Sequence, residues 1–304
     1  MPTLRFVERV CPVCGTSDRS SLWAQARFDP ARLDSMSFSS RKSPEHMHYR
    51  LLECARCDVL YASPVPTADD LMIAYRVADY VSAREAQLAA ETYARVLTDI
   101  IPALPDRRGA IDIGAGEGAF VEQLLAAGFA DVVGFEISTK AIAAANENVT
   151  RLIRAEPFDS TSLPPGPYSL VSCLQTIEHV PDPLDLCSSA ATALQPGGAL
   201  LIVCHNRRAI SARLLKRRSP IFDVEHLQLF SPTGIRRLLS RAGFERVEVR
   251  NLINRYPLGY WLRLAPGTDR MKRAIRTALV RTALDDVLLS LPAGNLVAIG
   301  YTPG

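Results

Sequence analysis

The chain has 304 residues, of which 48% are hydrophobic, and its formal net charge at pH 7 is +3. These values exclude a disordered chain and allow one large folded domain with a smaller one. So small a net charge does not by itself argue for nucleic acid, and a nucleic-acid partner is not expected. No apolar run approaches the length of a membrane span and the first residues lack a signal core, so the cytoplasm is the expected location.

Four of the seven cysteines form two CxxC pairs near the N-terminus. The pairs are Cys11 with Cys14 and Cys54 with Cys57, and the two-residue gap lets both thiolates of a pair bind one tetrahedral zinc ion. Four cysteine ligands leave no position for water, so the zinc is expected to be structural. Reduced or redox-active CxxC motifs are the alternative. We therefore expect a zinc-binding module over residues 1–66.

Two segments around the second cysteine pair are less informative. Between the pairs, the loop that holds Arg41 and Lys42 is expected to be solvated, with a fold over the active site as the alternative. After the module, residues 67–105 are expected to form linker or lid helices. Tyrosines at helical spacing there, Tyr75 and Tyr80, more often pack in a core than touch a ligand.

The stretch 110–138 contains a short apolar strand, a glycine turn, a helix and a second strand. Gly114, Gly116 and Gly118 let the backbone approach a ligand where a Cβ would clash. The second strand ends at Glu136, 20 positions after Gly116, where a carboxylate can accept hydrogen bonds from ribose hydroxyls. This is the pattern of a nucleoside-binding half of a doubly wound sheet.

The spacing of the glycines separates two kinds of nucleotide fold. In the dinucleotide fingerprint the third glycine follows the second by three residues, whereas Gly118 follows Gly116 by two. Asp112 and Glu117 flank the turn, and two carboxylates would repel a pyrophosphate but suit a ligand with sulfonium and ammonium groups. The stretch therefore resembles motif I of the class I S-adenosylmethionine-dependent methyltransferases. A dinucleotide enzyme is the alternative.

This resemblance implies an α/β fold with a seven-stranded Rossmann-like methyltransferase sheet over residues 106–304. S-adenosylmethionine is the implied cofactor. The cofactor-binding residues that the resemblance implies are Asp112, Gly114, Ala115, Gly116, Gly118, Glu136, Ile137, Phe158, Asp159, Cys173 and Leu174.

The second informative segment, QTIEHVPDP, follows an expected strand at 168–174. Doubly wound folds place ligands at this carboxyl end of a strand. The segment, with Glu178 and His179, looks like the corresponding one in ubiquinone-pathway O-methyltransferases. A histidine here can take a proton from a hydroxyl during methyl transfer, and capping of the loop is the alternative role.

Two further groups follow the expected fifth strand. A basic cluster at 207–218 suits a phosphate or carboxylate on the substrate, with a solvated helix face as the alternative. A second Glu-His pair ends at His226, the third candidate catalytic residue. The two pairs resemble the metal site of plant small-RNA 2′-O-methyltransferases. Gln175 stands where those enzymes have a glutamate, which argues against a catalytic metal.

The last strands are expected at 244–249 and 296–301, with an insertion at 251–294 between them. The insertion is expected to cap the substrate, and a dimer contact or a membrane-surface contact are the alternatives. A homodimer is left open.

Together these features predict an enzyme that transfers a methyl group from S-adenosylmethionine to a small molecule in a biosynthetic pathway. The expected acceptor is an anionic, sugar or natural-product intermediate, with oxygen as the favoured acceptor atom. The alternative is a nucleic-acid methyltransferase or adaptor whose zinc module and arginine cluster grip phosphates.

Overall fold

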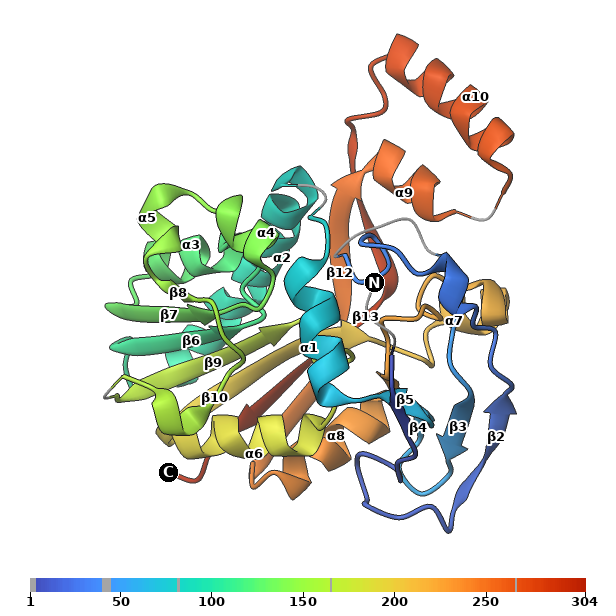
Figure 1. Ribbon diagram of the computed structural model, residues 1–304. Helices are drawn as coiled ribbons and strands as arrows, with labels where there is room; N and C mark the ends of the chain where they lie inside the picture. Colours follow the sequence, from blue (N-terminus) through green and yellow to red (C-terminus); the bar gives the residue numbers. More distant parts are fainter. Residues whose placement is uncertain (1–3, 40–44, 81–82, 165, 266) are drawn as a thin grey trace.

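The computed structural model describes residues 4–39, 45–80, 83–164, 166–265 and 267–304. A Rossmann-like α/β domain packs against a small N-terminal sheet, and a two-stranded arm projects away from both (Figure 1). The expected fold class is confirmed. None of the described helices is long and apolar enough to span a bilayer.

Seven strands form the main sheet, which from one edge to the other contains β12 (Arg246–Pro257), β13 (Leu288–Tyr301), β10 (Leu194–His205), β9 (Tyr168–Leu174), β6 (Gly109–Ile113), β7 (Asp131–Phe135) and β8 (Ile153–Arg154). The strands from β10 to β8 run parallel, and β13 runs antiparallel to both of its neighbours. The chain order reverses between β6 and β9, so the switch point that binds ligands in open α/β sheets lies there.

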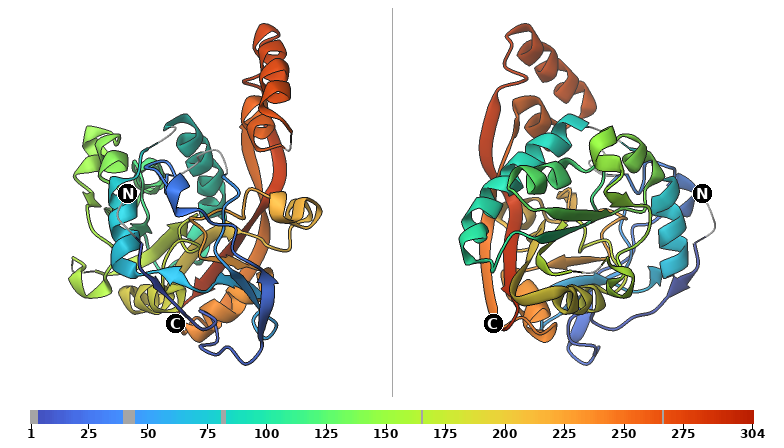
Figure 2. Two further views of the ribbon diagram at one scale, coloured as in Figure 1. Left: turned by 45° about the vertical axis from the view of Figure 1, so that its right-hand side comes forward. Right: turned by 90° about the vertical axis from the view of Figure 1, so that its left-hand side faces the viewer.

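Helices cover both faces of the main sheet (Figure 2). One face carries α2 (Ala83–Ile100) and α3 (Ala119–Ala126), and the other carries α6 (Pro183–Ala193) and α8 (Pro232–Arg241). Shorter helices are α1 (Ala68–Val77), α4 (Thr139–Ala143), α5 (Glu147–Thr150) and α7 (Ile210–Leu215).

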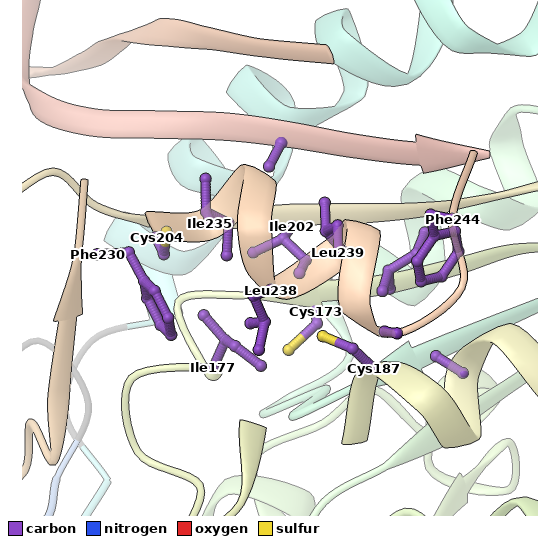
Figure 3. Packing of buried hydrophobic residues seen from close by; sticks show 14 of the residues in the cluster. Cys173, Ile177, Cys187, Ile202, Cys204, Phe230, Ile235, Leu238, Leu239 and Phe244 are labelled. Atoms are coloured by element: carbon purple, nitrogen blue, oxygen red, sulfur yellow. The ribbon is translucent and has the colours of Figure 1, made fainter. Parts of the chain in front are cut away.

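Helix α8 illustrates why these segments are helical. The Ser231 hydroxyl accepts a hydrogen bond from Gly234 N at 2.9 Å, which caps the first turn. Apolar residues then recur at helical spacing, and Leu238 and Leu239 are fully buried. Figure 3 shows them over the sheet in one core cluster with Cys173.

The N-terminal sheet contains one strand from a distant part of the chain. Its four strands are β11 (Gln228–Phe230), β4 (Val59–Ala62), β3 (Leu51–Cys54) and β2 (Ser20–Ala24). β11 follows His226 almost directly and pairs antiparallel with β4. The loop of the second Glu-His pair is therefore attached to the sheet that carries the cysteines. A separate pair of strands, β1 (Phe6–Val7) and β5 (Val65–Pro66), completes this region.

Two arginines of the basic cluster hold the N-terminal sheet to the main domain. The Arg207 side chain is only 4% exposed and forms ion pairs with Glu53 and, at 2.9 Å, with Asp58. Arg208 pairs with the same two carboxylates. Both cations are therefore engaged in ion pairs within the chain, Arg207 buried and Arg208 at the surface. Arg41 and Lys42 lie outside the described residues.

The final two strands are longer than the sequence pattern predicts. β12 and β13 stay paired from Arg246 and Tyr301 as far as Pro257 and Leu288, so the insertion at 251–294 continues the sheet as an arm. The tip of the arm carries α9 (Leu258–Leu264) and α10 (Asp269–Arg281). The expected strands at 244–249 and 296–301 cover only the part of this ribbon that lies within the domain.

Candidate active site

A cavity of about 1010 Å³ lies at the carboxyl ends of the parallel strands. The glycine turn after β6 lines one side of it, and α1 and α2 contribute Tyr75 and Tyr93. The arm contributes Tyr256 and Trp261, and the segment between the cysteine pairs contributes Phe38. Each structural unit of the chain therefore lines this single cavity.

The three glycines of the turn all have positive φ angles, at which glycine is strongly preferred. A Cβ added to Gly114 would lie 2.2 Å from Thr176 Oγ1, and one added to Gly118 would lie 2.2 Å from Val149 Cγ1. A Cβ added to Gly116 would meet no atom within 4 Å. Packing therefore requires the outer two glycines, while the middle one leaves backbone accessible to a ligand.

Three carboxylates surround the turn. Asp112 is 2% exposed and accepts a hydrogen bond from Ser172 Oγ at 2.7 Å, and burial raises its pKa to about 7. Glu136 accepts hydrogen bonds from Gly116 N at 2.8 Å and Ser138 N at 2.6 Å, and burial raises its pKa. Negative charge is therefore concentrated at this end of the cavity.

The third carboxylate, Glu117, is 8% exposed, and its Oε1 has no hydrogen-bond partner among the described residues. A buried carboxylate oxygen without a partner is costly. Because Glu117 lines the cavity, a ligand with N–H, O–H or cationic groups would compensate it.

Seven of the predicted cofactor-binding residues line the cavity: Asp112, Gly114, Ala115, Gly116, Glu136, Ile137 and Leu174. Gly118 lies behind the turn, and Cys173 is fully buried in β9. Phe158 packs edge-on against Phe135 with ring centroids 5.4 Å apart. Asp159 is exposed and caps a short turn by accepting from Thr161 N at 2.9 Å, so its carboxylate is already used locally.

His179 lies in the cavity beside Tyr75. Its Nδ1 is 3.0 Å from Tyr75 Oη and 3.0 Å from the carbonyl oxygen of Glu225. Because a carbonyl oxygen can only accept, this contact favours the tautomer with the proton on Nδ1. The Nε2 atom of His179 then carries the lone pair. Tyr75 was expected in a core, and no local pattern could have revealed a partner 104 residues away.

Two more histidines lie against His179 in a row. The ring of His226 is centred 4.9 Å from those of His179 and His205. His226 Nδ1 contacts the Ile221 carbonyl oxygen at 2.8 Å, and His205 Nδ1 contacts Asn295 Oδ1 at 2.8 Å. Burial lowers the pKa of His205 to about 4, so its ring is neutral at physiological pH.

Glu178 is fully buried and does not line the cavity. Its Oε1 accepts a hydrogen bond from His205 N at 2.7 Å, and burial raises its pKa to about 7. In the structure this side chain supports the end of β10. The sequence predicts a catalytic role for Glu178 from its place beside His179. The buried side chain, however, lacks the access that contact with a substrate requires.

Arg9 connects the N-terminal module to both histidine loops. Its guanidinium donates to the carbonyl oxygens of Ala62, Pro181 and Leu227, and to Gln228 Oε1 at 2.9 Å. Burial lowers the Arg9 pKa to about 10, which still leaves it charged at neutral pH.

The Gln228 amide extends this network to the loop of His179. Gln228 Nε2 donates to the carbonyl oxygen of Ile177 at 2.7 Å and to that of Val180 at 2.9 Å. These residues lie on either side of the Glu178–His179 pair. The position of His179 therefore depends on hydrogen bonds that originate in the N-terminal module.

The four cysteines of the two CxxC pairs converge. Their sulfur atoms all lie within 4.8 Å of one another, and Cys14 Sγ is 3.8 Å from Cys54 Sγ. Tetrahedral zinc with Zn–S bonds of about 2.3 Å places sulfur atoms about 3.8 Å apart, which matches that contact. Across the part of the chain that the structure describes, the two Glu-His pairs form no comparable group of metal ligands.

The charges around the cavity are of one sign. Among its described lining residues none is Lys or Arg, whereas six are acidic: Asp69, Asp112, Glu117, Glu136, Asp223 and Glu225. The basic cluster at 207–218 does not reach the cavity except through Leu215 and Ser211. None of the basic side chains of this cluster lines the cavity, and Arg207 and Arg208 are paired instead with carboxylates of the N-terminal sheet.

The strand order and the glycine turn, with Glu136 after the second strand, define a class I S-adenosylmethionine-dependent methyltransferase. Residues 82–249 match the family model described as a methyltransferase domain. Because this match covers more than half of the 304 residues, the chain belongs to that family.

Individual relatives are similar over the same region. A ubiquinone biosynthesis O-methyltransferase of Burkholderia pseudomallei is 28% identical over 181 residues, which cover 55% of this chain and 76% of that protein. The enzyme of the same description in Cupriavidus pinatubonensis is 28% identical over 172 residues, which cover 52% of this chain and 68% of that protein. A SAM-dependent methyltransferase structure from Archaeoglobus fulgidus has a TM-score of 0.48 and 19% identity, and the match covers 70% of this chain and 94% of that one.

Cofactor affinity should depend on pH through Asp112. Below its pKa of about 7 the carboxyl group is neutral, and a cationic ligand favours the ionised form. Calorimetric titration with S-adenosylmethionine should show affinity rising toward pH 7 by at most about tenfold per pH unit and then levelling off. Asp112→Asn should flatten this profile. A profile unchanged in the variant would contradict the assignment.

The stability of the ligand-free enzyme should depend on pH in the opposite direction from the cofactor affinity. Between pH 3.8 and about pH 7 the raised pKa of Asp112 makes the free energy of unfolding fall as the pH rises, and above about pH 7 this loss is complete. The difference in the midpoint of thermal unfolding between the free enzyme and Asp112→Asn should therefore change across this range and stay constant above it.

Arg9→Ala should displace the histidine loops. Hydrogen bonds from a charged group contribute about 1.5–3 kcal/mol, so we expect a loss of that order in the free energy of unfolding. Chemical denaturation measures this loss, and Arg19→Ala, at an exposed arginine of the N-terminal module, is the control. NMR signals of the His179 ring should shift in Arg9→Ala and return in part in Arg9→Lys. Equal effects of both alanine variants would be evidence against the network.

Proposed function

We propose that this methyltransferase acts on a hydroxyl group of a neutral small molecule, with His179 as general base. The observation that carries the proposal is the position of His179 in the same cavity as the glycine turn, with its Nδ1 engaged by Glu225 O. A general base must lie within reach of the proton it removes and present a lone pair there. His179 Nε2 meets the second condition in the inferred tautomer.

The residues around the glycine turn fit S-adenosylmethionine. Gly116 offers uncovered backbone, Glu136 lies where ribose hydroxyls are bound in this class, and Glu117 has a buried oxygen that lacks a protein partner among the described residues. When bound, the cofactor supplies an electrophilic methyl group on a sulfonium centre. The protein's contribution is to orient the two ligands and to exclude water.

The acceptor side of the cavity favours a neutral molecule. Three of the six acidic lining residues surround the glycine turn, and the other three, Asp69, Asp223 and Glu225, would repel an anion elsewhere in the cavity. The described lining contains no Lys or Arg to offset them. This supports the sugar or natural-product acceptor over the anionic one. Asn254 adds a buried amide whose Nδ2 has no hydrogen-bond partner among the described residues, so an oxygen on the acceptor has a donor available there.

The general-base role of His179 can be tested by substitution. His179→Gln keeps the volume but removes the basic nitrogen, and general-base loss should lower turnover by about 10²–10⁴-fold. Release of S-adenosylhomocysteine is measured against a library of hydroxylated sugars and aromatic compounds together with their carboxylated analogues. Tyr75→Phe keeps the ring and should lower turnover less.

Two outcomes would contradict this proposal. Undiminished turnover in His179→Gln would exclude the base, and a preference for the carboxylated analogues would exclude a neutral acceptor. Calorimetry with S-adenosylhomocysteine should give unchanged affinity for both variants, which separates a loss of chemistry from a loss of cofactor binding.

We also propose that the four clustered cysteines bind a structural zinc ion. Four thiolates would complete a tetrahedral coordination sphere and leave no position for a reacting water. The cluster is attached to β3 and β4, so the ion would stabilise the sheet that also holds β11. The zinc would then act on the site only through the position of the histidine loops.

Metal analysis of the purified protein tests this site. We expect one zinc ion per chain, and Cys54→Ser should lower both the zinc content and the midpoint of thermal unfolding. Cys187→Ser alters a buried cysteine outside the cluster and should retain the metal. Full zinc occupancy in Cys54→Ser, or none in the unaltered protein, would rule out the four-cysteine zinc site.

A further inference from the structure

Helix α10 lies at the tip of the arm, away from the sheet and from the N-terminal module (Figures 1 and 2). Its 13 residues, DRMKRAIRTALVR, contain five basic side chains and one acidic side chain. Whole-chain net charge is only +3, so positive charge is strongly concentrated here.

The helix is amphipathic but its apolar side is not fully covered. Apolar residues recur at positions 271, 274, 275, 278 and 279, which share one face of an α-helix. α9 is the element against which it packs, and Met271 remains 45% exposed and Ile275 40% exposed.

Only part of the basic charge is used inside the arm. Lys272 Nζ donates to the carbonyl oxygen of Arg263 at 2.8 Å, and Arg276 lies 3.8 Å from a carboxylate oxygen of Asp285. The remaining arginines, Arg270, Arg273 and Arg281, form no ion pair with any residue whose side chain the structure describes, a set that does not include Asp269. A cationic and apolar surface is thus presented to the outside.

We propose that α10 binds the surface of an anionic lipid bilayer. An amphipathic helix of this kind lies in the interface, with its apolar side chains among the acyl chains and its basic ones near anionic headgroups. A second copy of the chain would bring five more basic residues against the first five, which disfavours self-association through α10. A nucleic acid would satisfy the arginines but would leave Met271 and Ile275 exposed.

Bilayer binding would also place the active site near the membrane. The side of α9 that faces the protein carries Tyr260, Trp261 and Leu264, which line the cavity. A helix is about 10 Å across with its side chains, so the cavity wall would lie about one helix diameter from the bilayer.

Sedimentation with lipid vesicles tests the proposal on the whole 304-residue chain. We expect binding to phosphatidylcholine vesicles that contain phosphatidylglycerol, no binding to phosphatidylcholine alone, and release by added salt. The triple variant R270Q/R273Q/R281Q should bind more weakly by about fivefold per arginine. The control R151Q/R237Q/R241Q makes the same charge change at exposed arginines elsewhere and should bind as the unaltered protein does.

A second variant separates lipid insertion from simple charge attraction. M271S/I275S keeps every charge and should still lose vesicle binding. Calorimetry with S-adenosylhomocysteine should give the same affinity for all variants, which confirms that they fold. Since vesicle binding needs no methyl acceptor, its outcome is independent of the acceptor proposed above.

Several results would overturn the membrane assignment. They are no binding to the anionic vesicles, an equal loss in the control triple variant, and binding that M271S/I275S leaves unchanged. Equally tight binding of duplex RNA through the same arginines would identify a phosphate-binding surface. Sedimentation velocity that shows a dimer dissociated by I275S would identify a contact between two copies.

Discussion

The structure of the active site depends on the antiparallel pairing of β11 with β4. The carboxyl ends of a parallel sheet emerge as loops, and here two of these loops carry His179 and His226. β11 begins two residues after His226 and extends the N-terminal sheet, and Leu227 N donates to the Glu178 carbonyl oxygen at 2.9 Å. Both loops are held to the N-terminal sheet. The relative positions of the two histidines therefore depend on that sheet as well as on the main sheet.

The polarity of the cavity follows from how the charges are distributed through the fold. Arg207 and Arg208 neutralise Glu53 and Asp58 at the contact between the two sheets, so they stabilise the assembly that forms the cavity. The acids that remain line the cavity, where they suit the sulfonium group of S-adenosylmethionine. His205 stays neutral because it is buried.

The two helices of the arm face different surroundings. β12 and β13 remain paired beyond the domain and carry α9, whose inner residues complete the cavity, and α10, whose outer residues are exposed. If α10 binds a bilayer as proposed, the same insertion would both line the cavity and hold the enzyme at a surface. A loop of this length without paired strands would not hold α9 and α10 in fixed positions, since its backbone would lack a fixed conformation.

Local spacing by itself determined much of this protein. The glycine turn, the strand that ends at Glu136 and the two cysteine pairs are predictable, because each is set by residues close together in the chain. Only the tertiary structure decided that Tyr75 meets His179, that Arg207 serves an interface, and that β11 joins the N-terminal sheet. Those contacts join residues far apart in sequence, and packing of the whole chain selects them without leaving a periodic signal.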